Sequence, residues 1–68
     1  MTPRTFTARE KLKAAERELG FRRRVYATRV ADGRMKQADA DWQIGVMAAI
    51  ADDYRLLAAA ADQAGRLL

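Results

Sequence analysis

The chain has 68 residues, half of them apolar, and a formal net charge of +4. A chain this short forms at most one domain, buries only about 60% of its unfolded surface and is marginally stable as a monomer. It contains neither cysteine nor histidine, which excludes a disulfide framework and removes the commonest metal ligand and general base.

The composition favours an all-helical protein that associates with a partner. The chain is rich in alanine and has only four glycines and one proline, which argues against strands and against disorder. No apolar run approaches the ~20 residues of a membrane span, and the first residues lack the apolar centre of a signal peptide. We therefore expect a cytoplasmic protein without membrane contact, stabilised by oligomerisation or by a partner protein.

The first predicted helix covers residues 7–32 and follows a flexible lead-in at residues 1–6. Thr7 is a good N-cap and Glu10 lies three residues later, which predicts a capping box: the Thr7 hydroxyl accepts the Glu10 N–H, and the Glu10 carboxylate reaches back. Gly33 is a natural left-handed residue after the helix end. The apolar stripe that this helix turns inward consists of Ala8, Leu12, Ala15, Leu19, Tyr26 and Val30.

Three residues interrupt the regularity of this helix. Arg22 and Arg23 fall in the middle of the inner stripe, where their long stems can cover apolar surface while the guanidinium groups reach water. Gly20 costs about 1 kcal/mol relative to alanine in a helix interior. It marks a close helix crossing, a local bend or a tolerated glycine, and these alternatives stay open at the level of the sequence.

The second predicted helix covers residues 37–67 and follows the short turn 33–36. A link of this length makes the two helices antiparallel neighbours. A 4,3,4,3 spacing places its main apolar row on one stripe, namely Ala40, Ile44, Met47, Ala51, Tyr54, Ala58, Ala61, Gly65 and Leu68. A second row, interrupted at Asp53, lies roughly opposite and comprises Trp42, Val46, Ala49, Leu56 and Ala60. One neighbouring helix covers only one of these faces, so this helix needs a further partner.

In such a hairpin, facing positions have residue numbers that add to roughly 68, which places Phe21 and Val25 at the height of Val46 and Trp42. Either the outward apolar rows share one side and form an exposed patch, or the helices rotate and tuck Trp42 into the hairpin. The expected hairpin core is Leu12, Leu19, Tyr26, Ile44, Met47, Ala51 and Tyr54. The expected protein interface is Phe21, Val25, Trp42, Val46 and Ile50.

Charge is distributed unevenly along the chain. Eleven lysines and arginines and four acids precede Gln37, whereas two arginines and five aspartates follow from there on. This asymmetry indicates either a nucleic-acid surface or a basic helix that pairs with an acidic one. The candidate phosphate contacts, diluted by Glu10 and Glu16 nearby, are Arg9, Lys13, Arg17 and Arg24.

No catalytic or metal-binding constellation is evident in the sequence. It lacks a nucleophile–base pair, a glycine-rich phosphate loop and metal-ligand spacing. Asp39 and Asp41 lack the further oxygen ligands and the loop glycine of a calcium site. We expect a protein that is not an enzyme and that uses no metal or cofactor.

A set of residues between Glu16 and Arg55 forms an ordered pattern: Glu18, Leu19, Arg22–Tyr26, Val30, Gly33, Met35, Ala40, Asp41, Ile44, Met47, Ile50, Asp53 and Tyr54. The pattern resembles short uncharacterised helical proteins encoded in bacteriophage genomes and prophages. The chain departs from it at Ala27, where a proline is expected after the tyrosine, and at Lys36, where a serine or threonine is expected as the helix cap. The resemblance implies a phage or prophage origin and no mechanism.

The sequence thus predicts an all-α antiparallel two-helix hairpin that self-associates, most simply as a homodimer forming a four-helix bundle of coiled-coil type. Its predicted function is that of a non-enzymatic interaction module that binds a second copy, or a host or phage protein, through the apolar patch. The alternative is a small basic accessory protein that contacts nucleic-acid phosphates through the first helix.

Overall fold

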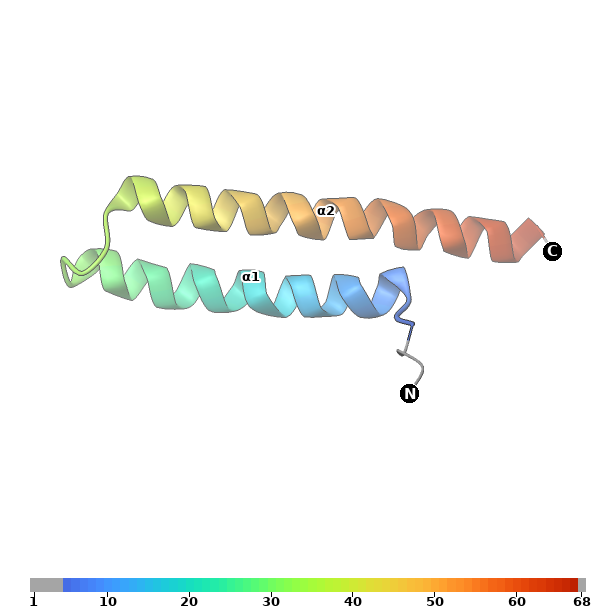
Figure 1. Cartoon of the computed structure of the whole chain (residues 1–68), viewed down its shortest axis with the longest axis horizontal. Coiled ribbons are helices and arrows are strands. Elements are labelled where there is room, and N and C mark those ends of the chain that lie inside the picture. The colour runs from blue at the N-terminus through green and yellow to red at the C-terminus, as the bar shows by residue number, and fades with distance from the viewer. Residues whose placement is uncertain (1–4, 68) are drawn as a thin grey trace.

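Two antiparallel helices make up the described part of the protein, residues 5–67 of a computed structural model (Figure 1). Helix α1 spans Ala8–Ala31 and helix α2 spans Gln37–Leu67. No strand occurs within residues 5–67. The predicted all-α hairpin is confirmed. Most of the lead-in expected at residues 1–6 lies outside the described residues.

Local hydrogen bonds fix both ends of α1. The Thr7 hydroxyl accepts the Glu10 N–H at 3.0 Å, and the Glu10 carboxylate accepts the Thr7 N–H at 3.2 Å, which confirms the predicted capping box. At the other end Gly33 has a φ of 73°, and the Arg34 N–H donates to the Arg29 carbonyl at 2.8 Å. This six-residue closure is a Schellman motif, so the glycine ends the helix as its position predicted.

The core is a single thin row of small and medium side chains between the helices. Its buried members are Leu12, Ala15, Leu19, Met47, Ala51 and Ala58, and the apolar residues packed partly against them are Ala8, Ile44, Ala48 and Tyr54. Ala40 is also buried. The expected core residue Tyr26 is half-buried and lies outside this cluster. Since three of the six buried members are alanines, the core removes little apolar surface from water.

The predicted inner row of α2 is only partly buried. Ala61 and Gly65 are exposed, and Leu68 lies outside the described residues. The physical reason is length: α2 has 31 residues and α1 has 24, so the end of α2 extends past the start of α1 (Figure 1). Gly65 therefore has no facing helix to cover it, whereas Ala61 lines an open hollow with Thr7 and Ala8 at the first turn of α1.

Polar contacts between the helices fix their register. Arg9 pairs with Asp62, a carboxylate oxygen of Glu16 lies 3.7 Å from the Arg55 guanidinium, and Arg22 bonds to Gln43. The paired residue numbers add to 71, 71 and 65, so they bracket the predicted value and confirm the predicted register.

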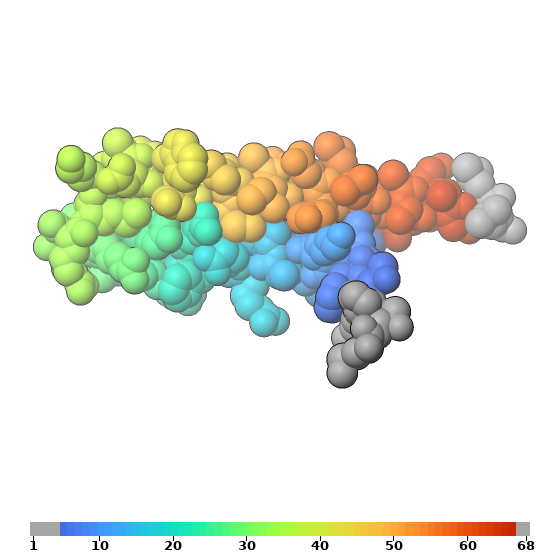
Figure 2. Space-filling model, in the orientation of Figure 1, coloured from blue at the N-terminus to red at the C-terminus, as the bar shows by residue number. Residues whose placement is uncertain are grey.

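The hairpin is a rod. Its radius of gyration is 15.8 Å, against about 11 Å for a globular domain of this length. Figure 2 shows the same elongated form, with the side chains of the two helices in contact along the length of α1. Such a shape leaves most side chains at the surface.

Gly20 has no packing role in this arrangement. It is exposed, and a Cβ atom built on it would meet nothing within 4 Å. The expectation that it marks a close helix crossing is therefore wrong.

Candidate functional site

The two seams between the helices define two flanks of the hairpin. On one flank Arg22 contacts Gln43, and the Lys11 ammonium lies 5.7 Å from the centre of the Tyr54 ring. On the other flank Glu16 faces Arg55. Successive residues of a helix are about 100° apart around its axis, so these contacts fix the flank on which every other residue lies.

An apolar side follows the flank that carries the Arg22–Gln43 contact. Helical spacing places all five predicted interface residues on it, and we call this set the apolar side: Phe21, Val25, Trp42, Val46 and Ile50. Trp42 is 64% exposed and Phe21 is 43% exposed, whereas Val25 and Val46 are half-buried. The alternative in which Trp42 tucks into the hairpin is wrong, because the tryptophan lies in the open.

Leu57 extends the apolar side toward the end of α2, and the predicted interface did not include it. It is 56% exposed and lies two turns after Ile50 on the same face of the helix. The neighbouring Leu56 is 71% exposed. The seven-residue spacing from Ile50 to Leu57 was the signal in the sequence that could have identified it. Asp53, between them on this face, is exposed and makes no ion pair with residues 5–67.

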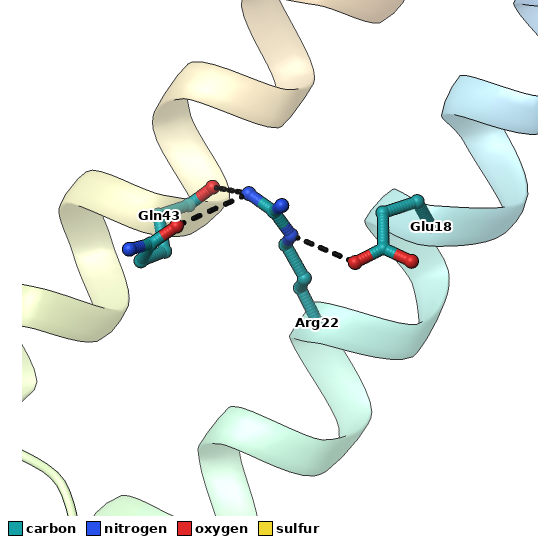
Figure 3. A network of polar contacts seen from close by, with 3 residues as sticks. All are labelled: Glu18, Arg22 and Gln43. Carbon is teal, nitrogen blue, oxygen red and sulfur yellow. Dashed lines mark hydrogen bonds and ion pairs between the residues drawn. The ribbon is translucent and has the colours of Figure 1, made fainter.

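A small polar network anchors the apolar side across the seam (Figure 3). The Nε of Arg22 donates to the Glu18 carboxylate at 3.0 Å, and its terminal nitrogen donates to the main-chain carbonyl of Gln43 at 2.8 Å and to the Gln43 side-chain oxygen at 3.3 Å. The Arg22 side chain is only 21% exposed. Arg22 is thus half-buried, with its guanidinium bonded across the seam, whereas Arg23 is exposed.

The network sets how the two halves of the apolar side meet. Because Arg22 bonds to the main chain of α2, it fixes the height of one helix against the other, independently of side-chain rotation in Gln43. Val25 lies on α1 one turn beyond Arg22, and Val46 lies on α2 one turn beyond Gln43. The apolar rows of the two helices are therefore held in one register.

A shallow hollow continues the apolar side at the turn. Trp42 and Met35 line it together with Gln43, Lys36 and Asp39. The hollow is open to solvent and mixes apolar and charged walls, so it suits a side chain of a partner more than a buried small molecule.

The basic residues of α1 fall into two groups. Of the four candidate phosphate contacts, Arg9 forms an ion pair with Asp62 across the second seam. Lys13, Arg17 and Arg24 are exposed, and none of them makes an ion pair within residues 5–67. Their helical positions place these three on the face of α1 roughly opposite its buried stripe.

Among residues 5–67, no group of three or more carboxylates is placed to hold a metal ion. Over the same part of the chain, neither helix contains a stretch long and apolar enough to cross a membrane. Every buried polar side-chain atom in this part has a hydrogen-bond partner, so no unsatisfied group marks a ligand pocket.

Comparison with known proteins found no matching family model, no similar curated protein and no similar solved structure. The phage or prophage origin implied by the sequence pattern stays a prediction. The apolar side and the exposed cations of α1 are the two surfaces of the hairpin that bear on its function.

Proposed function

We propose that the protein is a non-enzymatic interaction module that acts as a homodimer, with the apolar side of one hairpin packed against the apolar side of a second copy. The resulting unit is a four-helix bundle. The observation that carries the proposal is the exposure of Trp42, at 64%, beside Phe21, at 43%, on one side of a rigid hairpin. Aromatic residues gathered in this way mark the centre of protein interfaces.

The surface area of the chain supports this proposal. The accessible surface is 5530 Å², about 1,200 Å² more than the roughly 4,300 Å² expected for a folded monomer of 7.6 kDa. A stable interface buries about 800 Å² from each partner. The excess exposure of one hairpin is therefore large enough for an interface of ordinary size.

The spacing of the apolar residues also suits helix packing. Phe21 and Val25 lie four residues apart, as do Trp42, Val46 and Ile50, and rows of this spacing form the ridges that interdigitate when helices pack. A two-fold axis brings the same patch of each copy together, so a single self-complementary surface is sufficient. The core of one hairpin is thin, so the chain needs a partner for stability. A second copy is a partner that is present wherever the chain is made.

The solution mass of the full chain tests the proposal. Light scattering after size exclusion should give twice the chain mass of 7.6 kDa, at low and at high salt alike, because apolar association is not screened. A folded monomer would refute self-association and would direct attention to a host or phage protein as the partner of the same surface.

A pair of matched variants tests which surface is used. Trp42→Asp should give a monomer or an unfolded chain, because it places a charge at the centre of the apolar side. Ala59→Asp adds the same charge to an exposed position on the other flank of α2 and should remain dimeric. If Trp42→Asp stays a folded dimer, the interface lies on another part of the surface.

A further inference from the structure

We infer that α1 carries a second functional surface, which binds the phosphate backbone of nucleic acid and works independently of the apolar side. This phosphate-binding face consists of Lys13, Arg17, Arg23 and Arg24. All four side chains are exposed, and none forms an ion pair with residues 5–67. Arg23 lies at the edge of the face, toward the seam with α2.

Two of the three carboxylates of α1 are paired with arginines outside this face. Glu10 accepts the Thr7 N–H in the capping box. Glu16 faces Arg55 across the seam with α2. The third acid of α1, Glu18, accepts from Arg22 on the other flank. The sequence suggested that glutamates dilute the basic stripe. The fold reduces this dilution by drawing Glu16 and Glu18 toward arginines outside the face, whereas the Thr7 N–H that Glu10 accepts is uncharged and does not offset its negative charge.

The cations are spaced along a rigid rod. With a rise of about 1.5 Å per residue, Lys13 and Arg17 are separated by about 6 Å and Arg17 and Arg24 by about 10 Å along α1. Duplex nucleic acid presents one phosphate per roughly 1.7 Å of its axis, so this length of helix meets several phosphates at once. Arginine adds paired donors that match the geometry of phosphate oxygens.

Gly20, which has no side chain, leaves a depression in the helix surface between Arg17 and Arg24. It is exposed and in open space, and packing gives no reason for a residue that costs about 1 kcal/mol in a helix interior. Without a side chain at this position, a phosphate backbone can approach the helix while the flanking arginines reach it from both ends.

The chemistry of this face favours nucleic acid over a protein or a membrane. The cores of protein interfaces combine arginine with aromatic residues, and none of the four residues of this face is aromatic. Helices that lie on membranes carry large apolar residues beside the basic ones. Phe21, one turn beyond Arg17, only borders the face and belongs to the apolar side. The face also has no asparagine or glutamine to read base edges, so binding should be independent of sequence.

Fluorescence anisotropy with a labelled duplex and a labelled single strand tests the inference on the full chain. Four phosphate contacts per chain predict that the logarithm of the association constant falls with the logarithm of salt concentration at a slope of about −3.6 for duplex and about −2.8 for single strand. Two duplexes of equal length and different sequence should bind equally. No binding to either probe at low salt would overturn the inference.

A double variant and a matched control locate the surface. Lys13→Gln with Arg17→Gln should reduce the duplex slope to about −1.8. Lys11→Gln with Arg29→Gln removes the same charge from the same helix on the other flank and should leave the slope unchanged. Equal loss in the two variants would overturn the assignment to this face. Displacement by poly-glutamate as effective as displacement by nucleic acid at equal charge would overturn the assignment to phosphate.

Discussion

The polar network across the seam makes a prediction about the stability of the hairpin. In Arg22→Ala the protein loses a charge-assisted bond to Glu18 at 3.0 Å and a bond to the Gln43 carbonyl at 2.8 Å. It also loses the packing of a side chain that is only 21% exposed. Hydrogen bonds that involve a charged group contribute about 1.5–3 kcal/mol when buried, and an exposed helical ion pair contributes about 0.3–0.5 kcal/mol. Since Glu18 is half-exposed, we expect a loss of about 2 kcal/mol in the free energy of unfolding.

Two further variants separate the causes. Arg22→Met keeps an apolar stem and removes the guanidinium, so it should lose about 1.5 kcal/mol, the part that belongs to the hydrogen bonds. Arg23→Ala removes the neighbouring arginine, which is exposed and unpaired within residues 5–67, and should change stability by less than about 0.5 kcal/mol. This adjacent position is the matched control for net charge and for helix propensity.

Urea denaturation followed by circular dichroism measures all three variants. The protein concentration must be the same throughout, because the stability of a dimer depends on it. In a thermal scan, 2 kcal/mol corresponds to a fall of about 8–16 °C in Tm for a domain of this size. If Arg22→Ala is no less stable than Arg23→Ala, the bonds from Arg22 to Glu18 and Gln43 contribute nothing to the stability of the hairpin, and the expectation is refuted.

Two further predictions concern the backbone and the core. Gly20→Ala should raise the free energy of unfolding by about 0.5–1 kcal/mol because the site is helical and open. Gly33→Ala should lower it by about 1 kcal/mol because φ there is 73°. Shifts of the urea midpoint in the same direction for both variants would contradict these predictions. Ala51→Leu should destabilise by about 1–3 kcal/mol because the site is 1% exposed, whereas Ala49→Leu, at an exposed position of α2, should not. Equal urea midpoints for the two leucine variants would place the helix contact elsewhere.

Local signals in the sequence determined the secondary structure and the pairing of the helices. The side chains of Thr7 and Glu10 close the capping box on each other, and Gly33 adopts the backbone conformation that ends α1. Both features depend only on residues a few positions apart, so they could be predicted directly from the sequence. The register followed as well, because a short turn leaves two helices only one way to align.

The tertiary structure decided which side chains meet. An apolar period of 3.6 residues identifies the buried stripe, but it leaves the rotation of each helix about its own axis undetermined by a few tens of degrees. That rotation determines whether a residue at the edge of the stripe faces the other helix or the solvent. It turned Glu16 toward Arg55 and brought Arg22 onto the main chain of Gln43. It also left Trp42 outside the hairpin. Both candidate surfaces depend on this rotation. The residue types alone gave most of their members, but they included Arg9, which pairs with Asp62, and omitted Leu57 and Arg23.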